Sequence, residues 1–550
     1  MNIVFQLLQK YFTQEQYAFG GILVLTFVIN ILQTNYISSI TSSIIDTIEH
    51  RHFANAYSLF QTFIAVSVVY LGLLVVNEFL QIRVLTKLTP WMRVEFFKYI
   101  IRSNNEEMTQ QNAIKYSSPV NRVSYSATSM IHHFITNILS SIVFVIIISG
   151  YFLYKNPTLG GTFFFANIAL ITYIAWVWEG IMYYKNIYED HLNMNELTVI
   201  DMFNNFDKII YRGQAEKEIE MYSERAQKCI ESAADFHHVS SKHQLVMTAF
   251  IYVIILGAIW YLIRLREDSQ IDTKVFITFF TILLLYRDKI TSIMQTLPNF
   301  LEFNGRIKYC MEQMADIRGE YSEVGIRTYR PVNLPFDVIR FENVSYKYKT
   351  GNKNLFEKLS LTIRPNNNIV GITGVSGRGK STIMKLLLKL HEYSDGEIYI
   401  DEVNIREIDP HYIRENITYV NQSAKLFDKP VMDNLLYGCK DEATCAAYLD
   451  IIMRYPGIQK LYQNVDFHNT KSGLLGEGLS GGQRQVVNIL SGLVNPSKIL
   501  ILDEPTNALD LGLKTELIGI IDSFRKYKKC IIIISHDRDV YPLFDERIQI

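Results

Sequence analysis

A glycine-rich segment has the residue types that best fit phosphate chemistry. GVSGRGKST, Gly374–Thr382, satisfies G-x-x-x-x-G-K-[ST] and lies between the apolar runs NIVGIT and IMKLLLKL. Its glycines let backbone N–H groups curl around a phosphate, and the helix that follows presents its N-terminus to the anion. Lys380 should reach the β- and γ-phosphates of a nucleotide, and Ser381 should ligate Mg²⁺. The alternative, a glycine-rich turn that binds nothing, is disfavoured by the strand–loop–helix context.

Two acidic residues follow an apolar run further along the chain. KILILDE has the pattern of a buried strand that ends at Asp503 and Glu504. A carboxylate at a strand tip can hold Mg²⁺, and the next one can polarise an attacking water. Acids also occur at solvated strand ends, so the pattern alone is weak. Its place behind a phosphate-binding loop favours catalysis.

A second anion-binding helix start is predicted between these motifs. In LSGGQRQ, Leu479–Gln485, the residues Ser480, Gly481 and Gly482 would open a helix with free backbone N–H groups. One nucleotide in one domain has no need of two such helix ends. The repetition therefore indicates two copies that face each other head to tail, each closing the nucleotide site of the other.

The first half of the chain contains the charge-free stretches. Crossing the hydrocarbon core takes about 20 residues without charge. The windows that meet this length are Tyr17–Ile45, Tyr57–Asn77, Ile131–Tyr154, Thr158–Trp178 and Gln244–Ile263. The formal net charge of the whole chain is −1, which provides no basic field for nucleic acid. We therefore expect a lipid bilayer, and no nucleic acid, as a partner.

A sixth span is predicted from topology rather than from hydropathy. Val275–Tyr286 is a short apolar run that ends in the charged tripeptide RDK and resumes as ITSIMQTL. Lysine and arginine are concentrated in 80–130 and 181–243, so the positive-inside rule places these stretches in the cytosol. Six spans, unlike five, put the C-terminal domain on that same side.

The chain is predicted to form two domains joined by a linker. Residues 1–314 should form an all-α membrane domain of six spans with long cytosolic extensions. Its N-terminus, MNIVFQLLQKYFTQEQ, could form an amphipathic helix lying on the membrane before the first span. Residues 315–336 contain glycine and proline without apolar periodicity and read as a linker. Residues 337–550 alternate short β-branched runs with helical stretches, which is typical of an α/β nucleotide-binding domain.

Five cysteines occur at irregular spacing, and no two of them form a CxxC pair. All of them fall in segments that the topology places in the cytosol, where thiols stay reduced. We therefore expect buried or inert thiols.

The combination of motifs resembles one family. GVSGRGKST, LSGGQRQ, LILDEPTNALD and IIIISHD occur in the order and spacing of the ABC ATPases. A six-span domain placed first, with long cytosolic extensions, is similar to an exporter-type half-transporter (type I, or type IV) of the multidrug, lipid and peptide exporter group. The expected fold is then this all-α membrane domain followed by an α/β P-loop ABC ATPase domain, with ATP and Mg²⁺ as cofactors.

The family pattern implies roles for individual residues. Tyr348 in VSYKY would stack on adenine, Gln422 in YVNQ would sense Mg²⁺, and Asp510 in NALD would lie at a dimer interface. Glu504 would be the catalytic base and His536 the switch histidine on the γ-phosphate. The implied catalytic set is Glu504, His536, Gln422 and Lys380. The implied Mg²⁺ ligands are Ser381, Gln422 and Asp503. Further implied nucleotide contacts are Gly374, Val375, Ser376, Gly377, Arg378, Gly379, Lys380, Thr382, Ser480, Gly481, Gly482 and Gln483.

Two features depart from the family pattern. The turn GEG, Gly476–Gly478, runs straight into LSGGQ without the longer segment that usually separates them. The chain stops at RIQI soon after His536, so either the ATPase domain is short or the sequence is incomplete. By the same resemblance, Gln110–Ala127 and Phe206–Lys217 are expected to hold the coupling helices that dock onto the ATPase domains.

The expected function is ATP-driven export of an amphiphilic substrate (lipid, peptide or drug-like) by alternating access of a dimer. A homodimer would be self-sufficient, because one chain holds a complete set of motifs. A nucleotide-gated regulator or channel is the alternative, against which the intact Glu504 and LSGGQ count. Charge-free spans exclude a soluble ABC protein, and an importer would generally keep the two domains on separate chains.

Ionisable residues near the spans are candidates for a polar cavity, because charges at membrane depth face a cavity or one another. Glu78 and Glu179 are expected at cytosolic helix ends. Arg287, Asp288 and Lys289 are the better candidates, since the span continues beyond them.

Overall fold

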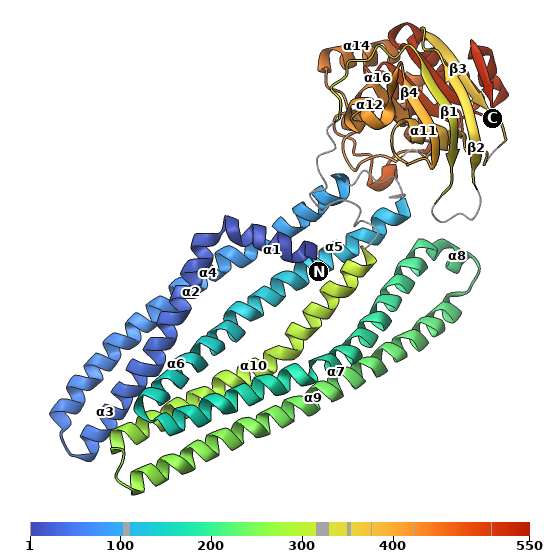
Figure 1. Ribbon diagram of the computed structural model, residues 1–550. Helices are drawn as coiled ribbons and strands as arrows, with labels where there is room; N and C mark the ends of the chain where they lie inside the picture. Colours follow the sequence, from blue (N-terminus) through green and yellow to red (C-terminus); the bar gives the residue numbers. More distant parts are fainter. Residues whose placement is uncertain are drawn as a thin grey trace. The chain divides into compact units, whose positions relative to one another are not determined.

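A computed structural model describes residues 2–102, 110–314, 329–348, 354–375, 377–423, 425–507 and 509–550. The described residues form two compact units, a helical one before residue 315 and an α/β one after residue 328. Figure 1 shows the helices of the first unit and the sheets of the second.

The helical unit is built from long helices. Its elements are α1 (Asn2–Gln14), α2 (Gln16–Ile31), η1 (Leu32–Ile37), α3 (Ser38–Glu49), α4 (Phe53–Arg102), α5 (Gln110–His133), η2 (Phe134–Leu139), α6 (Ser140–Lys155), α7 (Pro157–Asn204), α8 (Phe206–Tyr211), α9 (Ala215–Glu267) and α10 (Thr273–Gln313). The π-helical turns η1 and η2 continue their neighbouring helices. At 1.5 Å of rise per residue, α4, α7 and α9 are each about 70–80 Å long, against a hydrocarbon core of about 30 Å. These helices therefore extend well beyond a bilayer.

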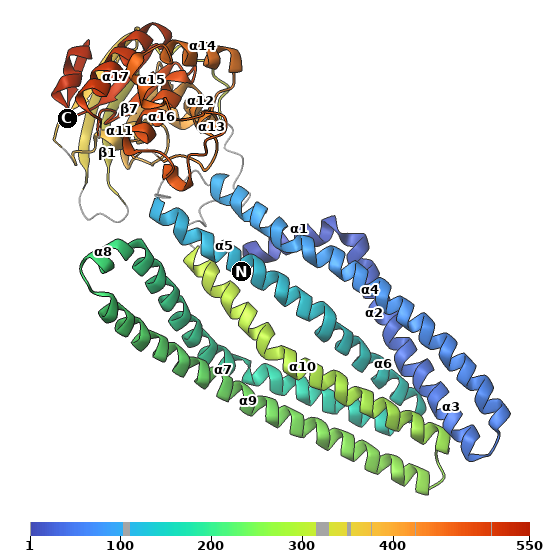
Figure 2. The same cartoon turned by 180° about the vertical axis from the view of Figure 1, so that it is seen from behind.

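Five helical stretches of the described residues are long and apolar enough to cross a membrane. They are Gln16–Glu49, Phe53–Ile101, Tyr116–Lys155, Pro157–Asn204 and Ala215–Glu267, and each contains one of the charge-free windows. The sixth predicted span lies in α10, which has 41 residues and runs beside α9 and α5 (Figures 1 and 2). Since α10 does not meet the same hydropathy standard, the count of six spans is not confirmed.

The N-terminal helix α1 is amphipathic, as predicted, but its apolar face lies against protein. Val4, Leu7 and Leu8 follow the spacing of one helix face and are buried. The hydroxyl of Tyr11 on the same face donates to the carbonyl oxygen of Val84 in α4 at 2.6 Å. This differs from the expectation of a helix lying on the membrane, because α4 covers the apolar face.

A cluster of opposite charges joins α5, α7 and α10. The side chains of Lys185 and Glu189 on α7 are 0% and 1% exposed, with Nζ and Oε1 3.0 Å apart. Glu189 also lies 3.2 Å from Arg122 of α5 and 3.7 Å from Arg306 of α10. Arg306 pairs in turn with Glu302 at 2.7 Å. Because each buried charge faces an opposite one from another helix or turn, the cluster fixes the register of the three helices.

Removing one buried member of this cluster should destabilise the helical unit. Glu189→Gln leaves the buried ammonium of Lys185 without its nearest carboxylate, and breaking such a pair costs about 3–5 kcal/mol. We expect a clear fall in the thermal unfolding midpoint of the purified full-length protein, followed by tryptophan fluorescence. Glu196→Gln is the matched control, because Glu196 also pairs with Arg122 but is 46% exposed. Equal, small shifts for both variants would contradict the structural role of the buried pair.

The α/β unit contains two sheets. A four-stranded antiparallel sheet has the order β2-β1-β4-β5, and a five-stranded parallel sheet has the order β6-β7-β8-β3-β9. The strands are β1 (Ile339–Tyr346), β2 (Phe356–Ile363), β3 (Asn368–Thr373), β4 (Asp395–Ile400), β5 (Val403–Asn404), β6 (Ile417–Val420), β7 (Ile499–Asp503), β8 (Cys530–Ile534) and β9 (Glu546–Gln549). The helices are α11 (Lys380–Leu387), α12 (Pro410–Asn416), α13 (Val431–Leu435), α14 (Glu442–Ile452), α15 (Pro456–Leu461), α16 (Gly481–Val494) and α17 (Leu511–Ser523), with short 3₁₀ turns η4 (Ile405–Glu407), η5 (Leu474–Gly476), η6 (Phe524–Tyr527) and η7 (Arg538–Leu543).

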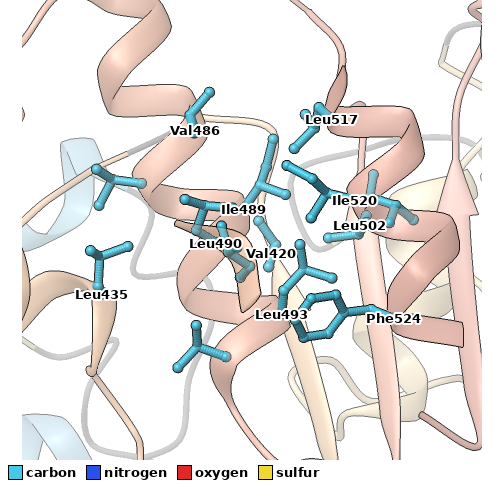
Figure 3. Close-up of a cluster of buried hydrophobic side chains, with 14 of the residues drawn as sticks. Val420, Leu435, Val486, Ile489, Leu490, Leu493, Leu502, Leu517, Ile520 and Phe524 are labelled. Carbon is cyan, nitrogen blue, oxygen red and sulfur yellow. The ribbon is translucent and has the colours of Figure 1, made fainter. Parts of the chain in front are cut away.

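The parallel sheet has a hydrophobic core on each face. All five residues of β8 are buried. Ile531 and Ile533 belong to one core, while Cys530, Ile532 and Ile534 belong to the other, as expected when successive side chains of a strand point to opposite faces. Figure 3 shows the first core, in which side chains of α16 and α17 meet those of the sheet. Burial on both faces explains why these strands read as continuous apolar runs.

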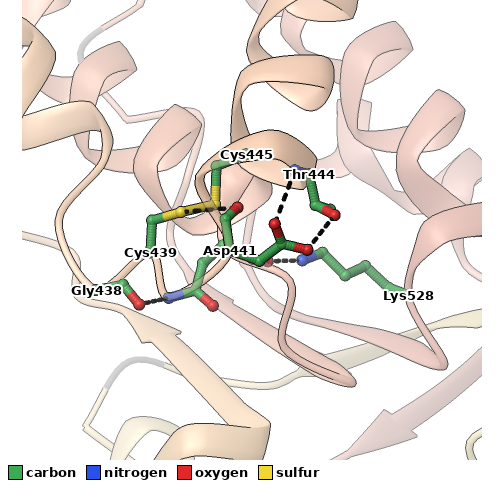
Figure 4. The surroundings of a disulfide bond; sticks show 7 residues. Gly438, Cys439, Asp441, Thr444, Cys445 and Lys528 are labelled. Carbon is green, nitrogen blue, oxygen red and sulfur yellow. Dashed lines mark hydrogen bonds between the residues drawn. A yellow bond between two sulfur atoms is a disulfide. The ribbon is translucent and has the colours of Figure 1, made fainter.

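The structure corrects the expectation for the cysteines. Cys439 and Cys445 form a disulfide with their Cα atoms 6.5 Å apart, within the range that a disulfide bridges. The side chain of Asp441 caps the start of α14 by accepting from the backbone N–H of Thr444, and this turn carries Cys445 back to Cys439 (Figure 4). Reduced thiols remain at Cys229, Cys310 and Cys530.

Lys528, close to this disulfide in Figure 4, is buried without a salt bridge among the described residues. Its ammonium donates to the carbonyl oxygen of Asn495, and burial lowers the pKa of Lys528 from 10.5 to about 8. Below pH 8 the folded protein therefore contains a buried charge that the unfolded chain solvates. Between about pH 8 and 10.5 the folded state sheds this proton before the unfolded state does, so the penalty falls as pH rises.

Lys528→Met should accordingly raise stability most at neutral pH. The penalty removed at pH 7 is on the order of 3 kcal/mol, from the size of the pKa change. The gain in unfolding midpoint should shrink when the full-length protein is measured at pH 9 and 10. Lys526→Met, at an exposed position on the same turn, should have little effect. A gain independent of pH would show that the buried amine is not the cause.

Candidate functional site

The glycine-rich loop joins β3 to α11 at one end of the parallel sheet. Gly374 has φ +149° and Gly379 has φ +90°. A Cβ at Gly379 would lie 2.8 Å from the side chain of Leu355, so both the backbone conformation and the space require glycine there. The ammonium of Lys380 folds back over the loop and donates to the carbonyl oxygens of Gly374 at 3.0 Å and Val375 at 3.1 Å.

The other predicted residues of the glycine-rich loop differ in their solvent exposure. Val375, Gly377 and Arg378 are exposed, Ser381 is half-buried, and Thr382 is buried at the start of α11. Ser376 lies outside the described residues, as do most of the predicted linker residues 315–336.

The order of the parallel sheet brings together motifs that are distant in the sequence. Strands β6, β7, β8 and β3 are neighbours and all run in the same direction. Their carboxyl ends therefore meet at one edge, the usual place of the ligand in such sheets. This edge receives Gln422 after β6, the acidic pair after β7, His536 after β8 and the glycine-rich loop after β3.

Glu504 and His536 are in direct contact. Oε1 of Glu504 lies 2.7 Å from Nδ1 of His536, and the hydroxyl of Ser535 donates to Oε2 at 3.3 Å. The backbone of Glu504 has φ +50°, an uncommon value for a residue with a side chain, and its N–H donates to the carbonyl oxygen of Ile534 at 2.9 Å. Glu504 is 7% exposed. Contacts from the end of β8 and the two residues after it thus fix its carboxylate in one orientation.

Asp503 offers a free oxygen that fits a metal ion. Tyr419 of β6 donates to Oδ2 at 2.7 Å, while Oδ1 is buried and has no hydrogen-bond partner in the described part of the chain. Buried polar atoms are rarely left unpaired. Together with the Ser381 hydroxyl and the amide oxygen of Gln422, which is exposed, this carboxylate supplies the oxygen ligands that Mg²⁺ prefers. These residues therefore fit a magnesium ion.

Tyr348 follows β1 and is linked to the start of α11. Its hydroxyl is 2.6 Å from the Thr382 hydroxyl, and its ring meets the rings of Tyr346 and His391 edge to face, with centroids 5.0 and 5.6 Å apart. These contacts hold an aromatic ring beside the helix that begins with Lys380.

The LSGGQ segment lies at the start of α16, and its polar side chains are hydrogen-bonded within the same chain. Ser480 and Gln483 form a reciprocal capping box, with Ser480 Oγ accepting at 3.2 Å and Ser480 N–H donating at 2.9 Å. The Gln483 amide also donates to the Leu461 carbonyl oxygen at 2.9 Å. The groups left for an anion are therefore the backbone N–H groups of Gly481 and Gly482. Across the described residues no hydrogen bond or ion pair joins this segment to the glycine-rich loop.

Asp510 and Asp537 begin the helical turns that follow β7 and β8. Asp510 is exposed and caps α17 by accepting from the N–H of Leu513 at 3.0 Å. Burial alone would raise the pKa of Asp537, but hydrogen bonds from Lys514 and Thr506 outweigh it and hold that pKa below its ordinary value. The ionised carboxylate ties α17 to the segment that begins at His536.

Sequence reasoning missed the groups that position the two acids. Tyr419 was inside the quoted motif YVNQ, and Ser535 inside IIIISHD, but their partners become visible only when β6, β7 and β8 are neighbours. The Lys514–Asp537 ion pair, 2.6 Å, had no signal in the motifs at all.

The three charged residues of α10 do not act as one group. Arg287 and Asp288 pair with each other at 2.8 Å and are 41% and 64% exposed. Lys289 instead lies 3.3 Å from the hydroxyl of Ser140 on α6. A shared polar cavity at this position stays a prediction.

Two family descriptions of known proteins match this chain. The family description "ABC transporter" matches residues 356–507, and "ABC transporter transmembrane region" matches residues 18–288. The transport/processing ATP-binding protein ComA of Streptococcus pneumoniae is 25% identical over 74% of this chain and 56% of its own length. The ATP-dependent lipid A-core flippase of Haemophilus ducreyi is 33% identical over 38% of this chain and 35% of its own length. The chain thus matches little more than half the length of ComA.

A solved structure has the same fold. The structure of a bacterial Atm1-family ABC exporter with ATP bound superposes with a TM-score of 0.83, covering 97% of this chain and 93% of that one, at 17% identity. This agrees with the predicted helical membrane domain followed by an α/β ATPase domain.

Loss of the Tyr348 ring should weaken nucleotide binding. Stacking contributes about 0.5–1.5 kcal/mol beyond area burial, so Tyr348→Ala should raise the Kd for a fluorescent ATP analogue several-fold in the full-length protein. Tyr348→Phe keeps the ring and loses only the contact with Thr382, so it should bind nearly as the parent does. If the phenylalanine variant binds as poorly as the alanine variant, the hydroxyl link is what matters, and stacking on adenine is wrong.

Proposed function

Because this chain belongs to the ABC transporter family, with its transmembrane and ATP-binding regions on one polypeptide, we propose that it hydrolyses ATP to export an amphiphilic substrate. The protein is a multi-pass membrane protein whose ATPase domain is cytosolic. The observation that carries the proposal is the contact between Glu504 and His536, 2.7 Å, at the sheet edge that also holds the glycine-rich loop. A regulator without turnover would not need this arrangement.

Different residues at the sheet edge have different roles in phosphoryl transfer. Backbone N–H groups of the glycine-rich loop and the ammonium of Lys380 bind the phosphates. Ser381, Asp503 and Gln422 would hold Mg²⁺, which would supply positive charge beside the phosphate oxygens. Glu504 orients the attacking water and accepts its proton. With Nδ1 engaged by Glu504, the Nε2 side of His536 is free to face the γ-phosphate.

Two copies of the chain complete each nucleotide site. The helix start at Ser480–Gly482 is exposed or half-exposed and makes no polar contact with the glycine-rich loop in the described residues of its own chain, so it is available to a second copy. Phe206 and Tyr211 of α8 are 53% and 83% exposed, and such apolar side chains suit docking onto an ATPase domain. The same turn was expected to be a coupling helix. We infer a homodimer, since one chain contains every motif.

The test is ATP hydrolysis by the purified chain in lipid nanodiscs, beside Glu504→Gln. The substitution keeps the shape of the side chain but removes the proton acceptor, which contributes typically 10²–10⁴-fold. We expect turnover to fall by at least about 100-fold while ATP binding persists. Glu477→Gln, at an exposed acid just before LSGGQ, is the matched control and should keep activity.

Either result for the parent protein is decisive. Turnover that Glu504→Gln abolishes would establish a competent ATPase, and flipping of an amphiphile in proteoliposomes would then test export. A parent protein that binds ATP but never hydrolyses it, with lipid and Mg²⁺ present, would refute the homodimeric exporter and favour the nucleotide-gated alternative.

A further inference from the structure

Lys289 lies in α10, the helix of the predicted sixth span, and has no ion-pair partner among the described residues. At 1.5 Å per residue it lies about 24 Å along α10 from Thr273, within a hydrocarbon core of about 30 Å. Its ammonium contacts the Ser140 hydroxyl at 3.3 Å and lies 5.9 Å from the centre of the Phe144 ring. The adjacent carboxylate of Asp288 pairs with Arg287 instead. In the described part of the chain, no carboxylate forms an ion pair with Lys289.

Polar groups from two other helices surround this position. Ser140 begins α6 and also receives a hydrogen bond from the Asn30 amide of α2 at 3.4 Å. Asn30 is 1% exposed, and its Oδ1 has no hydrogen-bond partner among the described residues. The hydroxyl of Ser141 donates to the backbone carbonyl of Lys289 at 3.3 Å. Three helices thus bring an ammonium and an unpaired amide oxygen together beside Ser140.

The backbone is irregular on both sides of these polar groups. The π-helical turn η1, Leu32–Ile37, begins just after Asn30, and η2, Phe134–Leu139, ends at the residue before Ser140. Such turns occur frequently at functional sites, because the extra residue re-aims side chains. An ionisable residue inside a membrane is costly and is retained mainly where it binds something.

We propose that Lys289, beside Ser140 and Asn30, binds the carboxylate or phosphate of an anionic amphiphile that the protein transports. The half-buried ammonium supplies N–H donors, and the anionic group of the ligand supplies the missing countercharge. Oδ1 of Asn30 accepts from a hydroxyl or protonated group of the same ligand. The lipid-like part of the ligand lies among the apolar side chains of the helices. The inference rests on the proposed export function, for which it names the substrate class.

The site is tested by equilibrium binding of three probes that have the same hydrocarbon tail length and differ in their headgroups. The full-length protein in phosphatidylcholine nanodiscs is titrated with labelled dodecyl phosphate, dodecanoate and dodecanol. The two anions should bind at least about tenfold more tightly than the alcohol, as expected for a hydrogen bond to a charged group. Lys289→Gln should remove this preference and Lys289→Arg should retain it. Lys274→Gln, an exposed lysine at the start of the same helix, is the matched control and should leave the preference intact.

Each outcome bears on the proposal. A preference for dodecyl phosphate over dodecanoate would identify a lipid-type phosphate as the ligand, and the reverse a carboxylate. Equal binding of all three probes to the parent protein would overturn the site, whether or not Lys289→Gln folds. An unchanged preference in a folded Lys289→Gln would overturn it too. The binding assay needs no ATP, so its failure is distinguishable from a failure of ATP hydrolysis.

Discussion

Parallel pairing of β6 with β7, of β7 with β8 and of β8 with β3 determines where the candidate catalytic groups of the ATPase unit lie. The strands can be neighbours in this order because their side chains are apolar on both faces, so each strand is buried between two cores. Polar chemistry is then confined to the strand ends. The contact between Glu504 and His536 exists because β7 and β8 end level with each other, Asp503 opposite Ile534.

Outside the nucleotide site, two buried lysines and one half-buried lysine are held in three different ways, and the differences separate structure from function. Lys185 is enclosed by carboxylates from two helices, so its charge is balanced within the fold. Lys528 donates to a backbone carbonyl and lies 5.9 Å from the centre of the Tyr448 ring, and burial lowers its pKa. Lys289 contacts a hydroxyl and forms no ion pair with a carboxylate among the described residues. Of the three, only Lys289 is therefore a cation whose charge an anionic ligand could balance.

The sequence was most informative where chemistry or burial is local. The glycine-rich loop, the two acids that end KILILDE and the five charge-free windows depend on neighbouring residues alone. The structure places them in a loop, at a strand end and in helices. The sixth span was ambiguous, because the charges at 287–289 interrupt its hydropathy. The disulfide between Cys439 and Cys445 was missed because topology suggested reduced thiols. Arg122, Glu189 and Arg306 come from three helices, and no local pattern reveals such a meeting.

The capping box of α16 supports the proposal that two copies of the chain share each nucleotide site. Ser480 and Gln483 satisfy each other, and Gln483 also binds Leu461, so the helix start is held in shape before any nucleotide arrives. A preformed anion site of this kind loses little conformational entropy on binding. It makes no polar contact with the glycine-rich loop of its own chain, as far as the described residues extend. A helix start that is preformed but, among the described residues, has no polar contact with that loop favours the proposal that a second copy supplies the phosphate.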